Sequence, residues 1–231
     1  MRKIATAPLG ALLLILAFGA MPVFAGPFGP TPYLSFADSP FAVLSFSYFY
    51  LEDFEDGLLN VPGVILGGSQ PSDILGPAFY TDSVDADDGL IDGSGKGGHS
   101  LWVHSGNQPT IITFTLGNLP THVGLVWTDG YTNVNVQLQA FGPGNVLLGT
   151  VGPAVLGDSS SFGETAEDRF FGWSDLGGIQ SIVLTDSGAG TEVDHLQFGQ
   201  LQSVPEPATI LLLGFGLFGL TRYGRRKFFG E

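Results

Sequence analysis

Short runs of alternating hydrophobic and polar residues fill the chain between residues 26 and 203. In the clearest run, every second residue from Val134 to Ala140 is hydrophobic, with Asn and Gln between them. A second run, from Ile112 to Leu116, alternates with threonine. Successive side chains of a strand point to opposite faces, so each run predicts a strand with one buried and one solvated face.

Similar patterns predict about nine short strands and no long helix in this stretch. Turn-forming pairs such as Gly117-Asn118 and Asp129-Gly130 separate the strands. Strands without intervening helices pack as two antiparallel sheets. We therefore expect an all-β fold, an antiparallel β-sandwich that is jelly-roll-like. The predicted strands are residues 41–51, 100–104, 112–116, 123–127, 133–140, 146–151, 169–173, 180–185 and 192–198.

Two segments around these strands have a different composition. Residues 26–40 form a Pro-rich lead-in, so we expect the β-sandwich domain to be residues 41–200. Within that domain, residues 57–98 are rich in Gly and Asp. This composition predicts loops over one end of the sandwich, interrupted by a short strand at residues 64–66.

The start of the chain has the features of a secretory signal peptide. Arg2 and Lys3 precede an apolar run from Leu9 to Ala20, and Val23-Phe24-Ala25 places small residues three and one before Gly26. The run is shorter than the ~20 residues that a membrane span needs. We expect an N-terminal signal helix within residues 1–25 that is removed on export. A retained N-terminal anchor is the alternative.

A second apolar segment lies near the other end. Residues 208–223 are hydrophobic in every direction of a helix, which predicts a C-terminal transmembrane helix. Its length of about 24 Å at the helical rise is short of a ~30 Å bilayer core. Basic side chains after it can reach the membrane boundary, and an exported body with a basic tail obeys the positive-inside rule.

Pro205-Glu206-Pro207 comes directly before this helix, and Arg222, Arg225, Arg226 and Lys227 lie at its end. This order of features resembles the PEP-CTERM sorting signal of Gram-negative bacteria, here in residues 201–231. The resemblance implies export across the inner membrane, followed by recognition and removal of the tail by an exosortase in the cytoplasmic membrane. It also implies a secreted body at the cell surface or in the extracellular matrix, associated with exopolysaccharide. A permanent tail anchor is the alternative. The residues that carry the resemblance are Pro205, Glu206, Pro207, Arg222, Arg225, Arg226 and Lys227.

The body carries a further resemblance. Five segments between Leu51 and Gly199 resemble a recurrent architecture among PEP-CTERM proteins, and their order is preserved. The first segment, 51–57, and the last, 192–199, also resemble the terminal strands of jelly-roll carbohydrate-binding modules. Such modules often hold a structural calcium between their first and last strands, which this resemblance implies here.

Charge separates the ends of the chain from its middle. Residues 26–202 contain 2 of the 8 bases and 20 of the 22 acids, so their net charge is −18. This excludes nucleic acid as a partner, because phosphate neutralisation needs clustered Lys and Arg. The absence of cysteine excludes disulfides and Cys-ligated metals. A hydrophobic content of 44%, with 19 Phe, is enough to bury a core.

The crowded acids suggest calcium. Five aspartates lie between Asp82 and Asp92, with glycines among them, and calcium takes six to eight oxygen ligands from such loops. The spacing does not fit an EF-hand, because Val84 and Ala86 occupy two of its ligand positions. A solvated acidic loop is the alternative. The predicted ligands in this loop are Asp85, Asp87, Asp88 and Asp92.

A second calcium site is predicted where the ends of the body meet. Asp194 has the same parity as Leu196 and Phe198, so it should point into the core, where a carboxylate needs hydrogen bonds or a cation. Glu55, near the end of the first predicted strand, is the second ligand. Arg169 is a competing partner that requires no metal.

Other chemistry is weakly supported by the sequence. No nucleophile elbow, phosphate loop or helical zinc motif occurs, so we expect no enzyme activity. A secreted glycoside hydrolase with paired catalytic carboxylates is an alternative, because acidic residues are abundant. Trp102 and Tyr131 are candidate sugar-stacking residues, with burial in the core as the alternative for Trp102. Trp127 has core parity with Val123 and Leu125.

Three functions follow from these features. The first is an exported, non-enzymatic surface or matrix protein sorted by its tail. The second is a calcium-dependent carbohydrate-binding module for exopolysaccharide. The third, and the weakest, is a secreted glycoside hydrolase.

Overall fold

The computed structural model describes residues 25–69, 72–86, 97–104, 108–130, 133–157, 165–188, 190–202, 212, 214–216 and 218. All of the strands lie in one compact unit, Phe24–Gln202, which we call the body. The strands are β1 (Gly26–Pro32), β2 (Phe46–Glu52), β3 (Val64–Gly68), β4 (Ile74–Leu75), β5 (Ser100–Val103), β6 (Thr110–Phe114), β7 (His122–Trp127), β8 (Val136–Gly142), β9 (Val146–Ala154), β10 (Arg169–Ser174), β11 (Ser181–Asp186) and β12 (Thr191–Leu201). Two short 3-10 helices, η2 (Phe36–Asp38) and η3 (Val84–Ala86), lie between strands.

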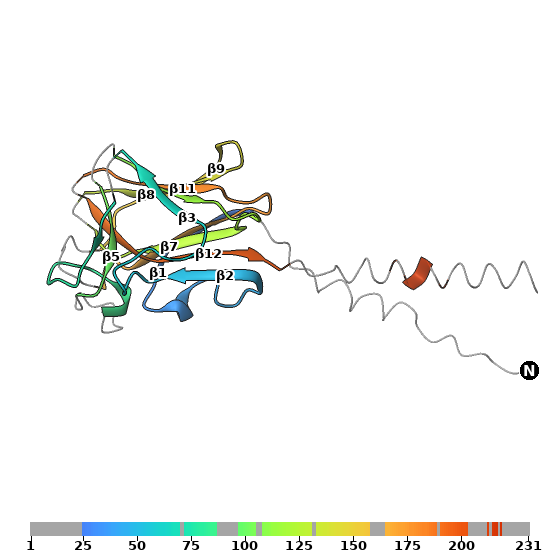
Figure 1. Cartoon of the computed structure of the whole chain (residues 1–231), viewed down its shortest axis with the longest axis horizontal. Helices are drawn as coiled ribbons and strands as arrows, with labels where there is room; N and C mark the ends of the chain where they lie inside the picture. The colour runs from blue at the N-terminus through green and yellow to red at the C-terminus, as the bar shows by residue number, and fades with distance from the viewer. Residues whose placement is uncertain are drawn as a thin grey trace, which may run out of the picture. The chain divides into compact units, whose positions relative to one another are not determined.

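The strands form two antiparallel sheets that lie in two layers (Figure 1). The larger sheet has the order β1-β10-β7-β12-β5-β4, and the smaller has the order β3-β6-β11-β8-β9. The long strand β12 pairs with β7 along one side. On its other side it pairs with β5 through its first residues and with β2 through its last. The prediction of an all-β, antiparallel sandwich is confirmed, while the jelly-roll detail stays a prediction.

The main core lies between the sheets and follows the predicted alternation. In β8, Val136, Leu138 and Ala140 are buried, whereas the intervening glutamines are half-buried on the other face. Trp127 and Phe171 of the larger sheet are fully buried and meet edge to face, with ring centroids 5.4 Å apart. Trp127 therefore has the core position that its parity predicted.

A second, smaller core covers the outer face of the larger sheet. Tyr33 and Phe41, from the segment between β1 and β2, pack there on Val126 and Phe170, together with Val84 of η3. The larger sheet is thus buried on both faces, which explains why nine consecutive residues of β12, from Thr191, are buried.

The Pro-rich segment 26–40 differs from the expected lead-in. Its residues 26–32 form β1, which pairs with β10 at the edge of the larger sheet. Gly29 has φ 82, and a Cβ at this position would lie 1.9 Å from the carbonyl oxygen of Phe170. Glycine therefore allows the two backbones to approach. The rest of the segment, with Tyr33 fully buried, supplies part of the outer core.

A bulge in β12 determines which side chains face the outer core. The register shifts between Asp194 and Gln197, and His195 has φ 46. Val193 and Leu196 consequently both reach the main core. The prediction that Asp194 shares a face with Leu196 is wrong, because the bulge changes the parity. Asp194 is fully buried, as expected, but against the outer layer, where Val84 donates to it.

The predicted terminal helices are not confirmed. The signal peptide lies outside the described residues except for Ala25. Residues 212, 214–216 and 218 are helical, in agreement with a helix at 208–223. No helix among the described residues is long and apolar enough to cross a membrane.

Candidate functional site

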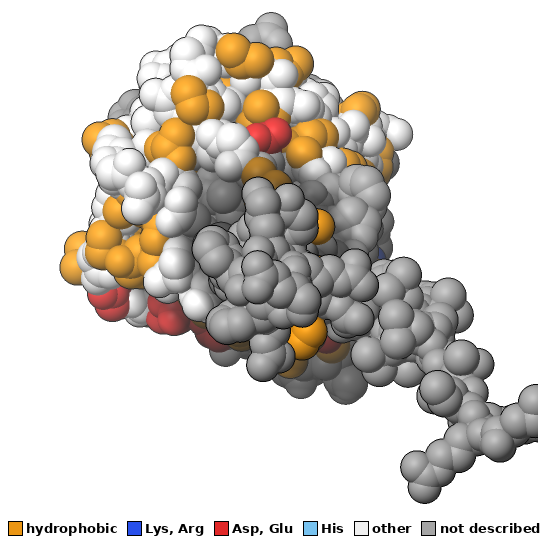
Figure 2. Space-filling view, turned by 90° about the vertical axis from the view of Figure 1, so that its right-hand side faces the viewer, with side chains coloured by type: hydrophobic (Ala, Val, Ile, Leu, Met, Phe, Trp, Pro, Cys, Tyr) orange, Lys and Arg blue, Asp and Glu red, His pale blue; other side chains and the backbone are white. Residues whose placement is uncertain are grey.

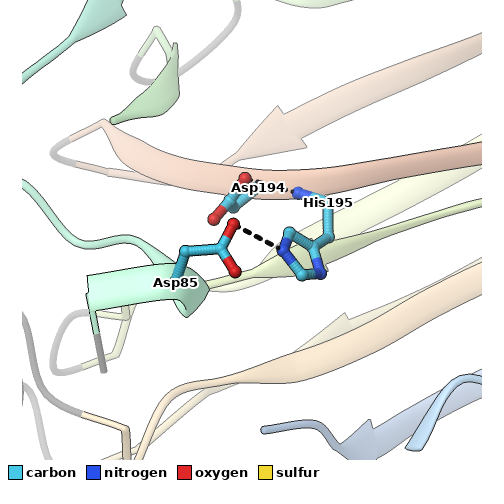
Figure 3. A group of neighbouring side chains, drawn as sticks. All are labelled: Asp85, Asp194 and His195. Atoms are coloured by element: carbon cyan, nitrogen blue, oxygen red, sulfur yellow. Dashed lines mark hydrogen bonds and ion pairs between the residues drawn. The ribbon is translucent and has the colours of Figure 1, made fainter. Parts of the chain in front are cut away.

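A group of three polar side chains, two of them buried and one exposed, lies where the bulge of β12 meets η3 (Figure 3). Asp194 and His195 come from β12 and Asp85 from η3. The His195 Nε2 lies 3.1 Å from Asp85 Oδ2. One potential ligand atom from each of the three residues lies within 4.8 Å of the others, close enough for one metal ion. We call this group the β12 triad.

The Asp194 carboxylate is stabilised by donors from the protein. Val84 N–H donates to Oδ2 at 2.9 Å, His195 N–H donates to Oδ1 at 2.6 Å, and the Ser83 hydroxyl lies 3.2 Å from Oδ2. Burial still raises the pKa of Asp194 to about 7, although His195 and these hydrogen bonds act against the increase. The hydrogen-bond requirement of this buried carboxylate is met without a cation.

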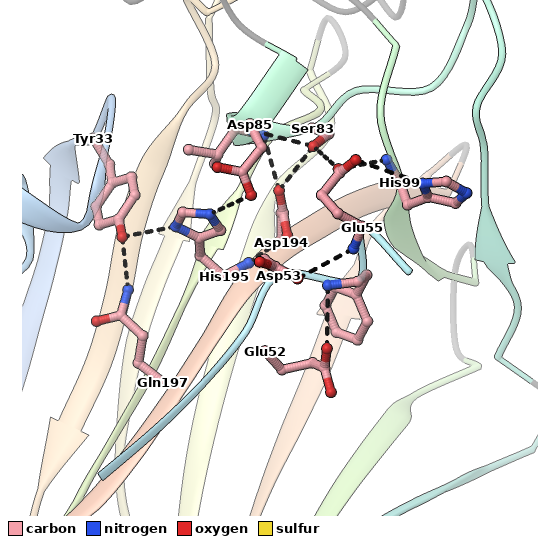
Figure 4. Close-up of polar contacts among 12 residues, drawn as sticks. Tyr33, Glu52, Asp53, Glu55, Ser83, Asp85, His99, Asp194, His195 and Gln197 are labelled. Carbon is pink, nitrogen blue, oxygen red and sulfur yellow. Dashed lines mark hydrogen bonds and ion pairs between the residues drawn. The ribbon is translucent and has the colours of Figure 1, made fainter. Parts of the chain in front are cut away.

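His195 lies at the junction of a chain of hydrogen bonds (Figure 4). The Ser39 hydroxyl donates to Gln197 Oε1 at 2.6 Å, and Gln197 Nε2 donates to the Tyr33 oxygen at 2.9 Å. Tyr33 O–H and His195 Nδ1 are 2.9 Å apart. When the proton of neutral His195 is on Nε2 and is donated to Asp85, Nδ1 accepts from the Tyr33 hydroxyl. Every hydrogen bond of the chain then runs in the same direction, from Ser39 to Asp85. We call this chain the Tyr33 relay.

The electrostatics of His195 follow from the same neighbours. Burial lowers the pKa of His195, but the hydrogen bond to Asp85 and the charge of Asp194 outweigh burial, so the pKa is raised. Burial is the largest cause of the raised pKa of Tyr33. The relay therefore keeps a neutral tyrosine beside a histidine that gains a proton more readily than usual.

Glu55 joins the site through Ser83. The Ser83 oxygen lies 2.6 Å from Glu55 Oε1, which also accepts from the His99 N–H at 2.7 Å. Ser83 thus bridges Glu55 and Asp194, the two residues predicted to bind calcium between the ends of the body (Figure 4). Glu52, nearby in β2, accepts from the N–H groups of Phe54, Asn60 and Val61 and closes the adjacent loop.

The predicted calcium ligands lie partly in this group. Asp85 and Asp194 lie together, and Glu55 is linked to Asp194 through the Ser83 hydroxyl. Asp87, Asp88 and Asp92 lie outside the described residues. Carboxylate oxygens suit calcium, but the imidazole of His195 suits transition metals. A metal ion on Nε2 would replace the hydrogen bond to Asp85. Calcium at this site therefore stays a prediction.

The predicted sugar-stacking residues do not form part of this site. Trp102 is half-buried in β5, and its ring lies against Gly190, where an added Cβ would meet Cζ2 at 2.2 Å. Tyr131 lies outside the described residues. Arg169, predicted as a partner of Asp168 or Asp194, donates through Nη1 to the main-chain oxygen of Asp168 at 2.7 Å.

Sequence reasoning missed the residues that complete the network: Tyr33, Ser83, His195 and Gln197. Tyr33 lies in a Pro-rich segment without alternation, and the positive φ of His195, which contacts Asp85, leaves no mark in the sequence pattern. The sequence signal that could have indicated this network is the group of polar residues within the run 192–198, which otherwise predicts a buried strand.

The described part of the chain has a shallow surface depression. The depression, about 490 Å³, lies on the exposed face of the smaller sheet. Its lining residues are Pro109, Asn135, Gln137, Pro153, Thr185, Asp186 and Ser187. On the face shown in Figure 2 the described side chains are mostly hydrophobic or uncharged, and acidic ones gather at the lower edge.

Comparison with known protein families finds a match in the tail. Residues 203–227 match the PEP-CTERM protein-sorting motif. All of the predicted sorting residues, from Pro205 to Lys227, lie in this match, although outside the described residues. No curated protein and no solved structure matches the chain. The tail thus carries a PEP-CTERM sorting motif, which indicates an exported protein that an exosortase sorts to the cell surface.

Proposed function

We propose that the protein is a non-enzymatic component of the cell surface or extracellular matrix, associated with exopolysaccharide. The sorting motif at residues 203–227 is the observation that carries this proposal. The signal peptide directs the chain across the inner membrane, and the C-terminal helix holds it in the cytoplasmic membrane until the exosortase removes the tail. The body is the part that is released.

The positions of the acids support a non-enzymatic role. Glycoside hydrolysis needs two carboxyl groups about 5–9.5 Å apart that contact the substrate. Among the described residues, the depression on the smaller sheet contains one carboxylate, Asp186. Glu52 and Asp194 are at most 4% exposed and are held by donors from the protein, so they do not contact a polymer.

The processing step is tested by mass spectrometry of the mature protein and by a tail variant. The wild-type protein should be recovered in the surface or matrix fraction without the peptide 225–231. Replacing Pro205-Glu206-Pro207 by alanines should leave an intact tail in the membrane fraction. Glu231→Ala, an acidic change outside the matched residues, is the control and should behave as wild type. An intact 225–231 peptide in the mature wild-type protein would refute the processing step.

Calcium-dependent carbohydrate binding is the second candidate. The depression on the smaller sheet favours it, because amide and hydroxyl groups of Asn135, Gln137, Thr185 and Ser187 are suited to sugar hydroxyls. Retention of the protein by polysaccharide in a gel, with calcium or with chelator, tests it. Gln137→Ala should reduce retention. Gln139→Ala, on the same strand but outside the depression, should not. Equal retention of both variants would exclude this depression as the carbohydrate-binding site.

Calcium is proposed as a structural ion of the body. A chain without cysteine has no disulfides to stabilise it after export, and its excess of acids favours a divalent cation. Calorimetry of the wild-type protein against calcium tests this part. Absence of heat, together with an unchanged melting temperature at millimolar calcium, would remove the ion from the proposal.

A further inference from the structure

His195 brings a nitrogen atom to the β12 triad, and this nitrogen changes the kind of metal ion that the group suits. The imidazole Nε2 lies 3.1 Å from Asp85 Oδ2 (Figure 3). Two ligands that are each about 2.1 Å from one zinc ion lie about 3.0–3.4 Å apart, for angles of about 90–110° at the metal. Asp85 and His195 are therefore already separated by the distance between two neighbouring zinc ligands.

Asp194 supplies the third ligand atom from the buried side of the triad. Ligand atoms of the three residues lie within 4.8 Å of one another, and no other group of three His, Asp or Glu residues in the described part of the chain meets this condition. Asp194 Oδ1 accepts from the His195 N–H, its one donor among the described residues. A carboxylate oxygen has two lone pairs, so Oδ1 can bind an ion and keep this hydrogen bond.

Tyr33, which lies outside the triad, fixes the orientation of the His195 ring. The Tyr33 oxygen lies 2.9 Å from His195 Nδ1, and the two rings meet edge to face with centroids 5.5 Å apart. A histidine that binds a metal holds its other ring nitrogen in such a hydrogen bond, which sets the tautomer and aims the free nitrogen at the ion. Nε2 is thus held facing Asp85 before an ion binds.

The Tyr33 relay can run in either direction, which a metal ion on Nε2 requires. With the ion on Nε2, the neutral imidazole carries its proton on Nδ1 and donates it to the Tyr33 oxygen. The Tyr33 hydroxyl then donates to Gln197, whose amide turns over so that its oxygen faces Tyr33 and its nitrogen faces Ser39. Hydroxyl, amide and imidazole groups can each donate and accept, so the hydrogen bonds between them survive binding of the ion.

Charge and access both favour a divalent ion. With His195 neutral, the two carboxylates bring two negative charges to the triad, which one divalent ion balances. Arg169, the one Lys or Arg in the described part of the chain, donates to the main-chain oxygen of Asp168 and not to a triad carboxylate. Asp85 is exposed whereas Asp194 and His195 are buried, so an ion enters from the side of Asp85, where water can complete its coordination.

We propose that the β12 triad binds a zinc ion. Its ligands are Nε2 of His195 and one carboxylate oxygen from each of Asp85 and Asp194, with water in the remaining position. Zinc takes imidazole and carboxylate ligands in four-coordinate sites, whereas calcium takes six to eight oxygens. The proposed site therefore differs from the predicted calcium sites in its nitrogen ligand and in its smaller number of ligands. The ion joins η3 to the last strand of the body.

Zinc binding to the full-length protein tests the proposal. The protein is freed of metal with a chelator and is then titrated in a calorimeter with zinc and, separately, with calcium. The wild-type protein should bind zinc in one event that His195→Gln and Asp85→Asn each weaken by at least about tenfold. This event should also raise the melting temperature, and an equal concentration of calcium should not displace the zinc. Displacement by calcium would overturn the proposal, because it would assign the triad to calcium.

Variants with the same chemical changes elsewhere are the controls. Asp73→Asn removes one charge at an exposed residue, and His104→Gln removes an imidazole outside the triad. Both should bind zinc as the wild type does. Tyr33→Phe keeps the three ligands but removes the partner of Nδ1, so it should weaken zinc binding by about 10–100-fold. If His195→Gln and Asp85→Asn bind zinc as tightly as these two controls do, the proposed site is wrong.

Nitrogen NMR of the wild-type imidazole provides a readout that does not depend on the folding of His195→Gln. Zinc should shift the His195 Nε2 resonance and leave the proton on Nδ1. Asp85→Asn changes an exposed side chain and should fold in any case, so it remains available for the titration. No zinc binding by the wild type, or binding that leaves the Nε2 resonance unchanged, would overturn the proposal. Either result would leave the sorting of the protein by its tail intact.

Discussion

Replacing Tyr33 by phenylalanine removes one oxygen atom from the centre of the Tyr33 relay. The Tyr33 oxygen accepts from Gln197 Nε2 and lies within hydrogen-bond distance of His195 Nδ1, both at 2.9 Å. The ring, stacked on Phe170 with centroids 6.1 Å apart, keeps its packing in the variant. The substitution therefore tests the hydrogen bonds without creating a large cavity.

The expected cost follows from what the variant leaves behind. Tyr33, Gln197 and His195 are at most 4% exposed, so water cannot readily replace the missing oxygen. A buried polar group left without its partner costs about 1–3 kcal/mol. With two such groups, and some relaxation of the segment around Tyr33, we expect Tyr33→Phe to lower the free energy of unfolding by about 2–4 kcal/mol.

Urea-induced unfolding, followed by tryptophan fluorescence, measures this loss as a shift in midpoint at constant m value. Tyr48→Phe is the matched control, because its hydroxyl donates to the Asn118 carbonyl oxygen at 2.6 Å in an exposed position. Water can replace that bond, so the control should cost less than about 1 kcal/mol. Equal losses in the two variants would refute the relay as a source of stability.

Two further predictions concern the larger sheet. Burial in an aromatic cage lowers the pKa of His122 to about 4. In the unfolded chain His122 takes up a proton below about pH 6.5. Its contribution to the free energy of unfolding is therefore fully present above that pH and is lost toward pH 4, by up to about 3 kcal/mol. Urea unfolding of His122→Gln should show a smaller fall over this pH range. Gly124→Ala would place a Cβ 2.3 Å from Phe170 Cζ and should lower the unfolding free energy by about 1–3 kcal/mol. Gly117→Ala, with nothing within 4 Å, should change it by less than about 0.5 kcal/mol in the same assay.

The strands were predictable where one face is buried and the other is not. β8 has this property, and its pattern of buried and half-buried residues matches the alternation of the sequence. β1 does not, because Gly and Pro carry no alternation and the strand forms through pairing with β10. A local pattern cannot reveal a strand whose stability is supplied by a partner distant in sequence.

The candidate site was predictable only in part, for a related reason. The local density of acids indicated Asp85, and the position in a predicted strand indicated Asp194. The bulge at His195 then reversed the face on which Asp194 lies, and a positive φ leaves no mark in the alternation.

The prolines of β1 have a consequence for a protein that is exported to a crowded surface. β1 ends the larger sheet and β9 ends the smaller one, and the two strands are in contact along one side of the sandwich. Proline lacks the N–H that a neighbouring strand would need, and this side carries Pro27, Pro30, Pro32 and Pro153. A strand of another chain that approaches this side therefore meets an incomplete row of N–H donors. Copies can accumulate at high local concentration with less risk of adding to one another strand by strand.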